Sequence, residues 1–278
     1  MSMKLPNLSY MVKIGQLRYI QSRYESGGCR SPDHLSHELL SPGQIVGAHV
    51  RGVFRLDHLR RNPFYYYVLA RTKYYDDVFC KAIELGFDAI VNIGCGSDTR
   101  AHRFAAELRR AGCNVIECDQ ATAIETKRQL AGRKWPADQV VYQAIDLNDS
   151  AWPQLEAALR PWRMVLVMME GVSPYIDQNC FAAFLDFLAR NLPAMSRIAY
   201  DFKLRGSADD FGRQGRTIQP FRLPADESAV TEFHRRRGLI VDHFAQGSEM
   251  SLNYLPTLES AAFPLFTADA LVQLRIAR

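Results

Sequence analysis

Short apolar runs alternate with amphipathic stretches along the second part of the chain. From residue 87 onward the apolar runs occupy residues 88–96, 114–120, 139–147, 163–172 and 196–203, and helical periodicity fills the intervals between them. Runs that are apolar throughout, rather than at alternate positions, are typical of strands covered on both faces. The pattern therefore predicts a doubly wound α/β fold, with a seven-stranded, mostly parallel sheet of the Rossmann-like type.

The first part of the chain has a different pattern. Residues 1–80 are rich in aromatic and basic residues, and their periodicity predicts helices that Gly and Pro interrupt between residues 27 and 43. We therefore expect a helical N-terminal cap at residues 1–80 and the sheet domain at residues 81–278. A long polar segment at about 204–230 is interpreted as a lid insertion or, alternatively, as an exposed loop.

Composition excludes several classes of protein. Among 278 residues, 47% are hydrophobic, no apolar run reaches membrane-spanning length, and the first twenty residues lack the apolar core of a secretory signal. We expect a cytoplasmic protein that does not bind membranes. The net charge of +4 is small and evenly spread, which argues against nucleic acid as a partner. The six cysteines and seven histidines show no metal-ligand spacing, so we expect no metal site.

Glycines and acidic residues follow four consecutive predicted strands. These residues are Gly94 and Gly96, Asp119, Asp146 with its neighbour Leu147, and Glu170. Each has an ordinary alternative: a tight turn for the glycines, an exposed strand end for Asp119, and a turn at Asp146. Together they indicate a ligand, because the carboxyl ends of parallel strands share one edge and bind ligands there.

Five sequence blocks between about residues 70 and 177 carry a family resemblance. In order they are ARTKYYDD, VNIGCGSDTRAHRF, ECDQATAIETKR, IDLND and EGVSPYID. This series resembles the leucine carboxyl methyltransferase family of class I enzymes dependent on S-adenosylmethionine (SAM). The resemblance implies SAM as the cofactor and a small-molecule substrate. The aromatic run PFYYY before Arg71 departs from the members that modify protein phosphatases, which argues against a protein substrate.

The resemblance also implies roles for individual residues. Arg71 would bind the methionine carboxylate, Gly94 and Gly96 would form the turn beside the methionine, and Asp119 would bind both ribose hydroxyls. Asp146 and Leu147 would hold the adenine, and Glu170 would lie near the sulfonium and the amine. A guanidinium suits a carboxylate, and carboxylates suit hydroxyls and cations.

We expect Glu170, Tyr175 and Tyr67 to act in the reaction itself. A tyrosine ring can stabilise a sulfonium by cation–π attraction, worth about 0.5–2 kcal/mol. Successive tyrosines on a helix point in different directions, so at least one of Tyr65, Tyr66 and Tyr67 belongs to the core.

Three functions remain open from the sequence. The first is transfer of the SAM methyl group to a carboxylate, hydroxyl or amine of a small, natural-product-like acceptor. The second is cyclisation of SAM to azetidine-2-carboxylate with release of methylthioadenosine, because the bacterial azetidine-2-carboxylate synthases resemble this fold. The third is a cofactor-binding module without catalysis, which retention of every cofactor residue makes less plausible than the other two.

Overall fold

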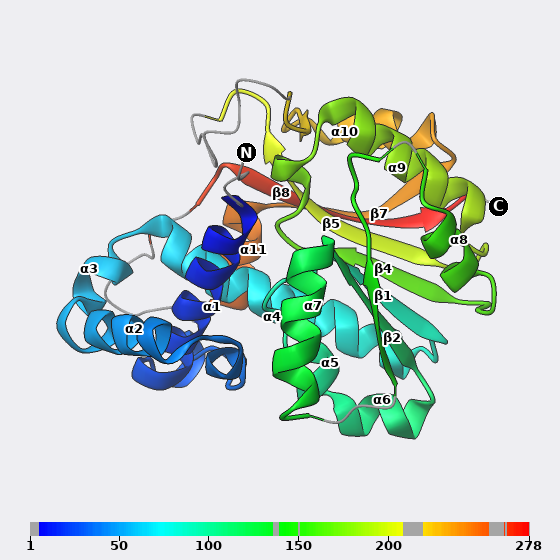
Figure 1. Cartoon of the computed structure of the whole chain (residues 1–278). Helices are drawn as coiled ribbons and strands as arrows, with labels where there is room; N and C mark the ends of the chain where they lie inside the picture. Colours follow the sequence, from blue (N-terminus) through cyan, green and yellow to red (C-terminus); the bar gives the residue numbers. More distant parts are fainter. Residues whose placement is uncertain are drawn as a thin grey trace, which may run out of the picture.

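The protein is built on one central sheet with helices on both sides (Figure 1). The computed structural model describes residues 6–135, 139–149, 151–207, 219–255, 264 and 266–277. The strands are β1 (Ala89–Ile93), β2 (Asn114–Asp119), β3 (Val140–Ala144), β4 (Val165–Met169), β5 (Arg197–Leu204), β6 (Arg222–Leu223), β7 (Leu239–Gln246) and β8 (Asp269–Ile276). Their order in the sheet is β3-β2-β1-β4-β5-β8-β7, and the short β6 pairs with β5 outside this path.

The first five strands are parallel, and β8 runs antiparallel to both β5 and β7. This confirms the predicted mostly parallel α/β fold. The two-residue β6 adds an eighth strand to the predicted seven. The strand order changes direction beside β1, whose neighbours are β2 and β4, and ligands of open α/β sheets bind at such a point.

Helices cover both faces of the sheet. They are α1 (Pro6–Tyr24), α2 (Pro42–Phe54), α3 (Leu56–Arg60), α4 (Pro63–Glu84), α5 (Arg100–Arg103), α6 (Ala105–Ala111), α7 (Ala121–Gly132), α8 (Pro153–Leu159), α9 (Gln178–Asn191), α10 (Glu227–Arg235) and α11 (Gly247–Tyr254). Short 3₁₀ turns are η1 (Gly27–Cys29), η2 (Ser36–Leu39) and η3 (Ser173–Tyr175). No helix in the described ranges is long and apolar enough to cross a membrane.

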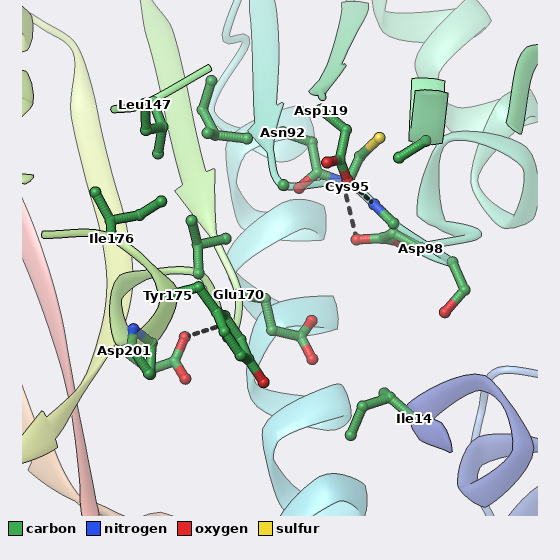
Figure 2. A pocket seen from close by; sticks show the side chains of 18 of the residues that line it. Ile14, Asn92, Cys95, Asp98, Asp119, Leu147, Glu170, Tyr175, Ile176 and Asp201 are labelled. Atoms are coloured by element: carbon green, nitrogen blue, oxygen red, sulfur yellow. Dashed lines mark hydrogen bonds between the residues drawn. The ribbon is translucent and has the colours of Figure 1, made fainter. Parts of the chain in front are cut away.

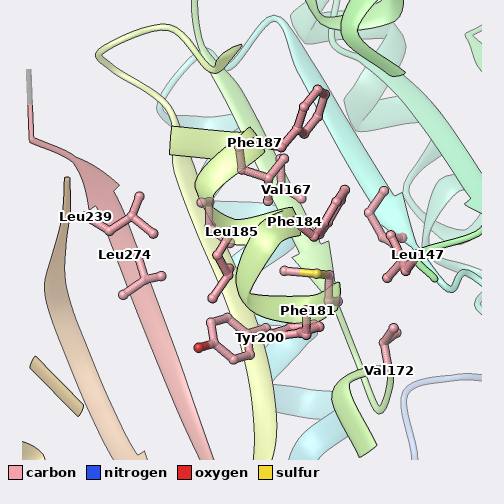
Figure 3. Close-up of a cluster of buried hydrophobic side chains, with 14 of the residues drawn as sticks. Leu147, Val167, Val172, Phe181, Phe184, Leu185, Phe187, Tyr200, Leu239 and Leu274 are labelled. Carbon is pink, nitrogen blue, oxygen red and sulfur yellow. The ribbon is translucent and has the colours of Figure 1, made fainter. Parts of the chain in front are cut away.

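Two apolar cores lie on opposite faces of the sheet. In the first, Phe181, Phe184 and Leu185 of α9 pack on Val167 of β4 and Tyr200 of β5 (Figure 3). The helix presents this stripe because its apolar residues recur at spacings of three and four. The second core joins α4 and α6 to the other face of the same strands. Burial on both faces explains why the strands are apolar throughout.

The cap and the sheet domain share the second core. Ile20 of α1 and Ala48 of α2 belong to the same cluster as Ile90 of β1 and Leu166 of β4. Helix α4 connects the two parts: its start is capped by the Asn62 side chain, which accepts a hydrogen bond from the Phe64 amide. The expected domain boundary at residue 80 falls inside this helix.

Part of the expected lid insertion lies outside the described residues, namely 208–218. The described flanks are ordered parts of the domain: Arg222–Leu223 forms β6, and α10 starts at Glu227 after the Asp226 cap. Two helices differ from what the hydrophobic periodicity of the sequence predicts. The helix expected at residues 98–112 is divided at Phe104 into α5 and α6, and α11 has no clear signal in the sequence.

Candidate functional site

A cavity of about 190 Å³ opens at the carboxyl ends of the parallel strands. Every predicted cofactor-binding residue lines it, together with Tyr175; these are Arg71, Gly94, Gly96, Asp119, Asp146, Leu147 and Glu170. In Figure 2 Asp119 and Leu147 lie at one end of the cavity, and Asp201 and Ile14 lie at the other. The site therefore has an end over β2 and β3 and an end over β4 and β5.

The glycine turn after β1 brings backbone close to the cavity. Gly94 has a φ of +65° and Gly96 a φ of +38°, a region that side chains rarely adopt. A Cβ on Gly94 would also lie 2.4 Å from a methyl carbon of Val172. The turn is fastened to β2, because the Cys95 amide donates to the Cys118 carbonyl at 3.0 Å. Glycine is thus required at position 94 for conformation and for space.

Asp119 ends β2 with both carboxylate oxygens beside this turn. Oδ2 accepts from the Gly96 amide at 2.9 Å, and Oδ1 accepts from the Gln120 amide at 2.7 Å. Burial raises the pKa of Asp119, while these two hydrogen bonds oppose the rise. A carboxylate oxygen accepts more than one hydrogen bond, so the fixed carboxylate can still receive two neighbouring hydroxyls.

Asp146 and Leu147 follow β3 in a tight turn. Oδ1 of Asp146 accepts from the Asn148 amide at 2.9 Å and from the Asn148 side chain at 3.1 Å. The Asp146 carbonyl accepts from the Trp152 indole at 2.8 Å, and the Leu147 side chain is buried. Both residues also line the cavity, so this turn forms part of the cavity wall.

Glu170 accepts hydrogen bonds from three arginines. Its Oε1 receives Arg18 Nη2 at 2.5 Å and Arg71 Nε at 3.2 Å, and its Oε2 receives Arg100 Nη1 at 2.8 Å. Burial by itself would raise the pKa of Glu170, but the three arginines outweigh it and lower the pKa to about 2. Glu170 is therefore a fixed negative charge at neutral pH.

Arg100 and Arg71 differ in how many donors they have left. Arg100 uses Nε on Asp76 at 2.7 Å, Nη1 on Asp98 at 2.6 Å, and Nη2 on the Thr72 carbonyl at 3.0 Å. Arg71 uses Nε and Nη1 only, and within the described ranges nothing is bonded to its Nη2. Arg71 also lines the cavity, which Arg100 does not. Of these two arginines, Arg71 is therefore the one with a donor edge toward the cavity. Arg18 also lines the cavity, with its Nε on the Thr72 hydroxyl and its Nη2 on Glu170.

The sequence reasoning missed several residues of this site. Arg18, Asp98, Asp201, Lys203 and Asp269 all line the cavity and are buried. Asp98 stands within the glycine-turn block, where its position was a usable signal. Arg18 reaches Glu170 across 152 residues of sequence, and no local pattern marks such a contact.

The two tyrosines expected to act in the reaction lie in different places. Tyr175 of η3 lines the cavity. Tyr67 is fully buried and is not among the described residues that line the cavity; its ring lies 5.3 Å from Arg71 Cζ and 4.6 Å from the Phe266 ring. Its neighbours Tyr65 and Tyr66 are also buried. Tyr67 therefore contacts the site through Arg71.

The sheet order, the glycine turn and the acidic strand ends define a class I methyltransferase fold. Comparison of sequences shows more: residues 40–189, over half of the chain, match the leucine carboxyl methyltransferase family, and the chain belongs to that family. This confirms the resemblance inferred from the sequence blocks. S-adenosylmethionine is the methyl donor after which its relatives are named.

Two relatives illustrate the similarity. A Parafrankia sp. protein, classed by name with the S-adenosyl-L-methionine-dependent methyltransferases, is 27% identical over 164 residues, which cover 58% of this chain and 51% of that protein. A Mycolicibacterium smegmatis protein of the same class is 32% identical over 153 residues, covering 52% and 47%. The chain thus spans about half the length of the curated relatives it matches.

Among solved structures, the magnesium protoporphyrin IX methyltransferase of Synechocystis with bound S-adenosylhomocysteine has a TM-score of 0.47 and 13% identity. The match covers 84% of this chain and 99% of that one.

Proposed function

We propose that this chain binds SAM along the cavity and catalyses its reaction with a small molecule. The observation that carries the proposal is convergence: seven residues from five separate sequence blocks line one cavity. The adenosine would lie over β2 and β3, against Asp119, Asp146 and Leu147. The methionine would lie over β1 and β4.

The charges at the methionine end suit the amino acid part of SAM. Among the described residues nothing is bonded to Nη2 of Arg71, which leaves that edge for the carboxylate, and Glu170 is held ionised for the amine and the sulfonium. Tyr175 lines the cavity and would present its aromatic ring to the sulfonium. Tyr67 would support the same end indirectly, by packing against Arg71.

For the reaction, we favour methyl transfer to a carboxylate, hydroxyl or amine of a small acceptor. A lone pair of the acceptor attacks the methyl carbon, the carbon–sulfur bond breaks, S-adenosylhomocysteine leaves, and the acceptor gives up any proton to a neighbouring group or water. The protein's contribution is alignment and exclusion of water. The acceptor would lie over β5 and β8, where Lys203 and Asp269 line the cavity; Phe64 of α4 lines it as well.

A second reaction is cyclisation of SAM itself. The α-amine attacks the γ-carbon, the bond from that carbon to sulfur breaks, and azetidine-2-carboxylate, methylthioadenosine and a proton are formed. The observation in its favour is the cap: Ile14 and Arg18 of α1 line the cavity, so α1 covers the end where an acceptor would meet the methionine. The proton released from the amine would pass to a neighbouring polar group or to water.

Calorimetry with SAM and with S-adenosylhomocysteine tests the binding site. We expect Arg71→Ala to weaken SAM binding at least tenfold, because the ligand carboxylate loses a charged donor in a buried site. Arg109→Ala, on the exposed face of α6, is the matched control and should bind as the wild type does. Failure of the wild type to bind either compound would remove the proposed function.

Mass spectrometry of the products separates the two reactions. The enzyme is incubated with SAM alone, and then with SAM and a cell extract that supplies acceptors. Methylthioadenosine above the spontaneous background with SAM alone would establish cyclisation. Demethylated product that forms only with the extract would establish methyl transfer and exclude cyclisation.

A further inference from the structure

Asp201 lies within β5, and no feature of the sequence singled it out. Its side chain is almost fully buried, at 1% exposed, yet it lines the cavity at the end opposite Asp119 (Figure 2). Burial of a carboxyl group destabilises the folded state unless hydrogen-bond or ion-pair partners compensate for the lost solvation. Its partners therefore indicate its purpose.

Three donors from two other elements meet at Asp201. Oδ1 accepts from the Gly171 amide at 2.6 Å and from the Tyr75 hydroxyl at 3.2 Å, and Oδ2 accepts from Arg71 Nη1 at 3.2 Å. Tyr75 and Arg71 are one turn apart on α4, and Gly171 follows β4. Asp201 thus ties together α4, the turn after β4 and β5, directly at the cavity.

The turn at Gly171 fits closely against Arg71. Gly171 has a φ of +68°, and a Cβ there would lie 3.3 Å from both Nη atoms of Arg71. The guanidinium is therefore held at its Nε by Glu170, at its Nη1 by Asp201, and on its side by the Gly171 turn. Nη2 is the edge to which none of the described residues is bonded, and a planar guanidinium fixed in this way presents that edge in one direction.

We propose that Asp201 is a positioning residue that orients Arg71 to bind the carboxylate of SAM. The inference rests on the proposed SAM site. Glu170 alone leaves the guanidinium free to rotate about its bond to one oxygen, whereas a second carboxylate on Nη1 fixes its plane. A purely structural role is the competing explanation. It predicts that loss of the negative charge changes stability but not the binding of SAM through Arg71.

The protonation state of Asp201 provides a second way to test its role. Burial raises its pKa to about 6; Arg71 and the Gly171 amide oppose the rise, and Asp269 and Glu170 add to it. The remaining titratable groups that face it are Tyr67 and Tyr75 of α4, and the pKa of each is raised well above its ordinary value, so both stay neutral. Lys203 pairs with Asp269 at 2.6 Å. Between pH 7.5 and pH 5, Asp201 is therefore the group next to Arg71 that changes charge.

The test is a double-mutant cycle on SAM affinity, measured by calorimetry. Asp201→Asn keeps the size and one acceptor oxygen but places an amide against Arg71. We expect it to weaken SAM binding about tenfold at pH 7.5, within the usual range for coupled neighbours. In an Arg71→Met background the same change should have less than a twofold effect. Asp88→Asn is the control, because Asp88 also accepts from backbone amides, but at the start of β1.

The pH profile provides an independent readout. As the pH falls from 7.5 to 5, protonation of Asp201 removes its charge from Arg71, so wild-type SAM affinity should fall about tenfold more than that of Asp201→Asn. Asp119, whose pKa is also raised by burial, is present in both proteins and does not contribute to this difference. Equal affinities for Asp201→Asn and wild type, or an undiminished effect of Asp201→Asn in the Arg71→Met background, would overturn the inference. If Asp201→Asn does not fold, a flat wild-type profile overturns it alone. Wild type that binds no SAM would instead refute the proposed function.

Discussion

Replacement of Asp119 by alanine tests the adenosine end of the site directly. The variant removes a carboxylate whose oxygens are already oriented by the Gly96 and Gln120 amides, at 2.9 and 2.7 Å. If each oxygen also accepts one ribose hydroxyl, two hydrogen bonds to a charged group disappear. Each is worth about 1.5–3 kcal/mol. Water entering the space left by the side chain restores part of this.

We therefore expect Asp119→Ala to bind SAM about 100-fold more weakly, equivalent to about 3 kcal/mol. S-adenosylhomocysteine, which has the same ribose, should lose affinity by the same factor. Because the ribose is remote from the sulfur, the ratio of the two affinities should not change. Isothermal titration calorimetry of both compounds measures the effect, and thermal unfolding checks that the variant is folded.

Asp242→Ala provides the matched control, since Asp242 is an exposed acid of β7 that pairs with Arg275 far from the cavity residues. Its affinity for both compounds should equal that of the wild type. The reasoning would be refuted if Asp119→Ala bound SAM within threefold of wild type while remaining folded. It would also be refuted if only one of the two compounds lost affinity.

Two further predictions concern stability. Gly94→Ala should lower the free energy of unfolding by about 2 kcal/mol, because alanine is strained at positive φ and its Cβ would contact Val172. Gly86 has a φ of +75° with open space around it, so Gly86→Ala should lose only the free energy that the strained φ costs. Urea titrations of the two variants measure the difference. Burial raises the pKa of Glu117 to about 7 despite its partner Lys127. The folded state therefore holds this proton more tightly than the unfolded state does, and the wild type should lose stability as the pH rises from 5 to 7. Glu117→Gln should flatten that loss by about 1–2 kcal/mol, and an unchanged slope in urea titrations at several pH values would contradict the assignment.

The parts of this protein that the sequence predicted are those with a local signal. Continuous apolar runs predicted the parallel strands, and the residues at their ends predicted the cavity lining, because parallel strands necessarily place those ends together. Asp119 and Glu170 were found in this way. The division of the helix at Phe104 was not, since apolar spacing continues through the break.

The missed residues act across long separations. Arg18 approaches Glu170 from 152 residues away, and Asp201 lies inside a strand where its neighbours Tyr200 and Phe202 are core residues. Alternation along β5 places Asp201 on the opposite face from those two, toward α4. The one signal in the sequence was a charged residue within a predicted buried strand, and the apolar residues on either side of Asp201 made that signal easy to miss.

The shared core under α4 has a consequence for how this chain can be divided or recombined. A fragment cut at residue 80 would leave Ile90 and Leu166 uncovered on one face of the sheet and would take Arg18 and Arg71 with the discarded part. Neither fragment would then hold both an intact core and the groups around Glu170. Exchange of the first eighty residues between related proteins should therefore succeed only when the sheet face that packs on α4 and the residues around Glu170 come from the same protein as Arg18 and Arg71.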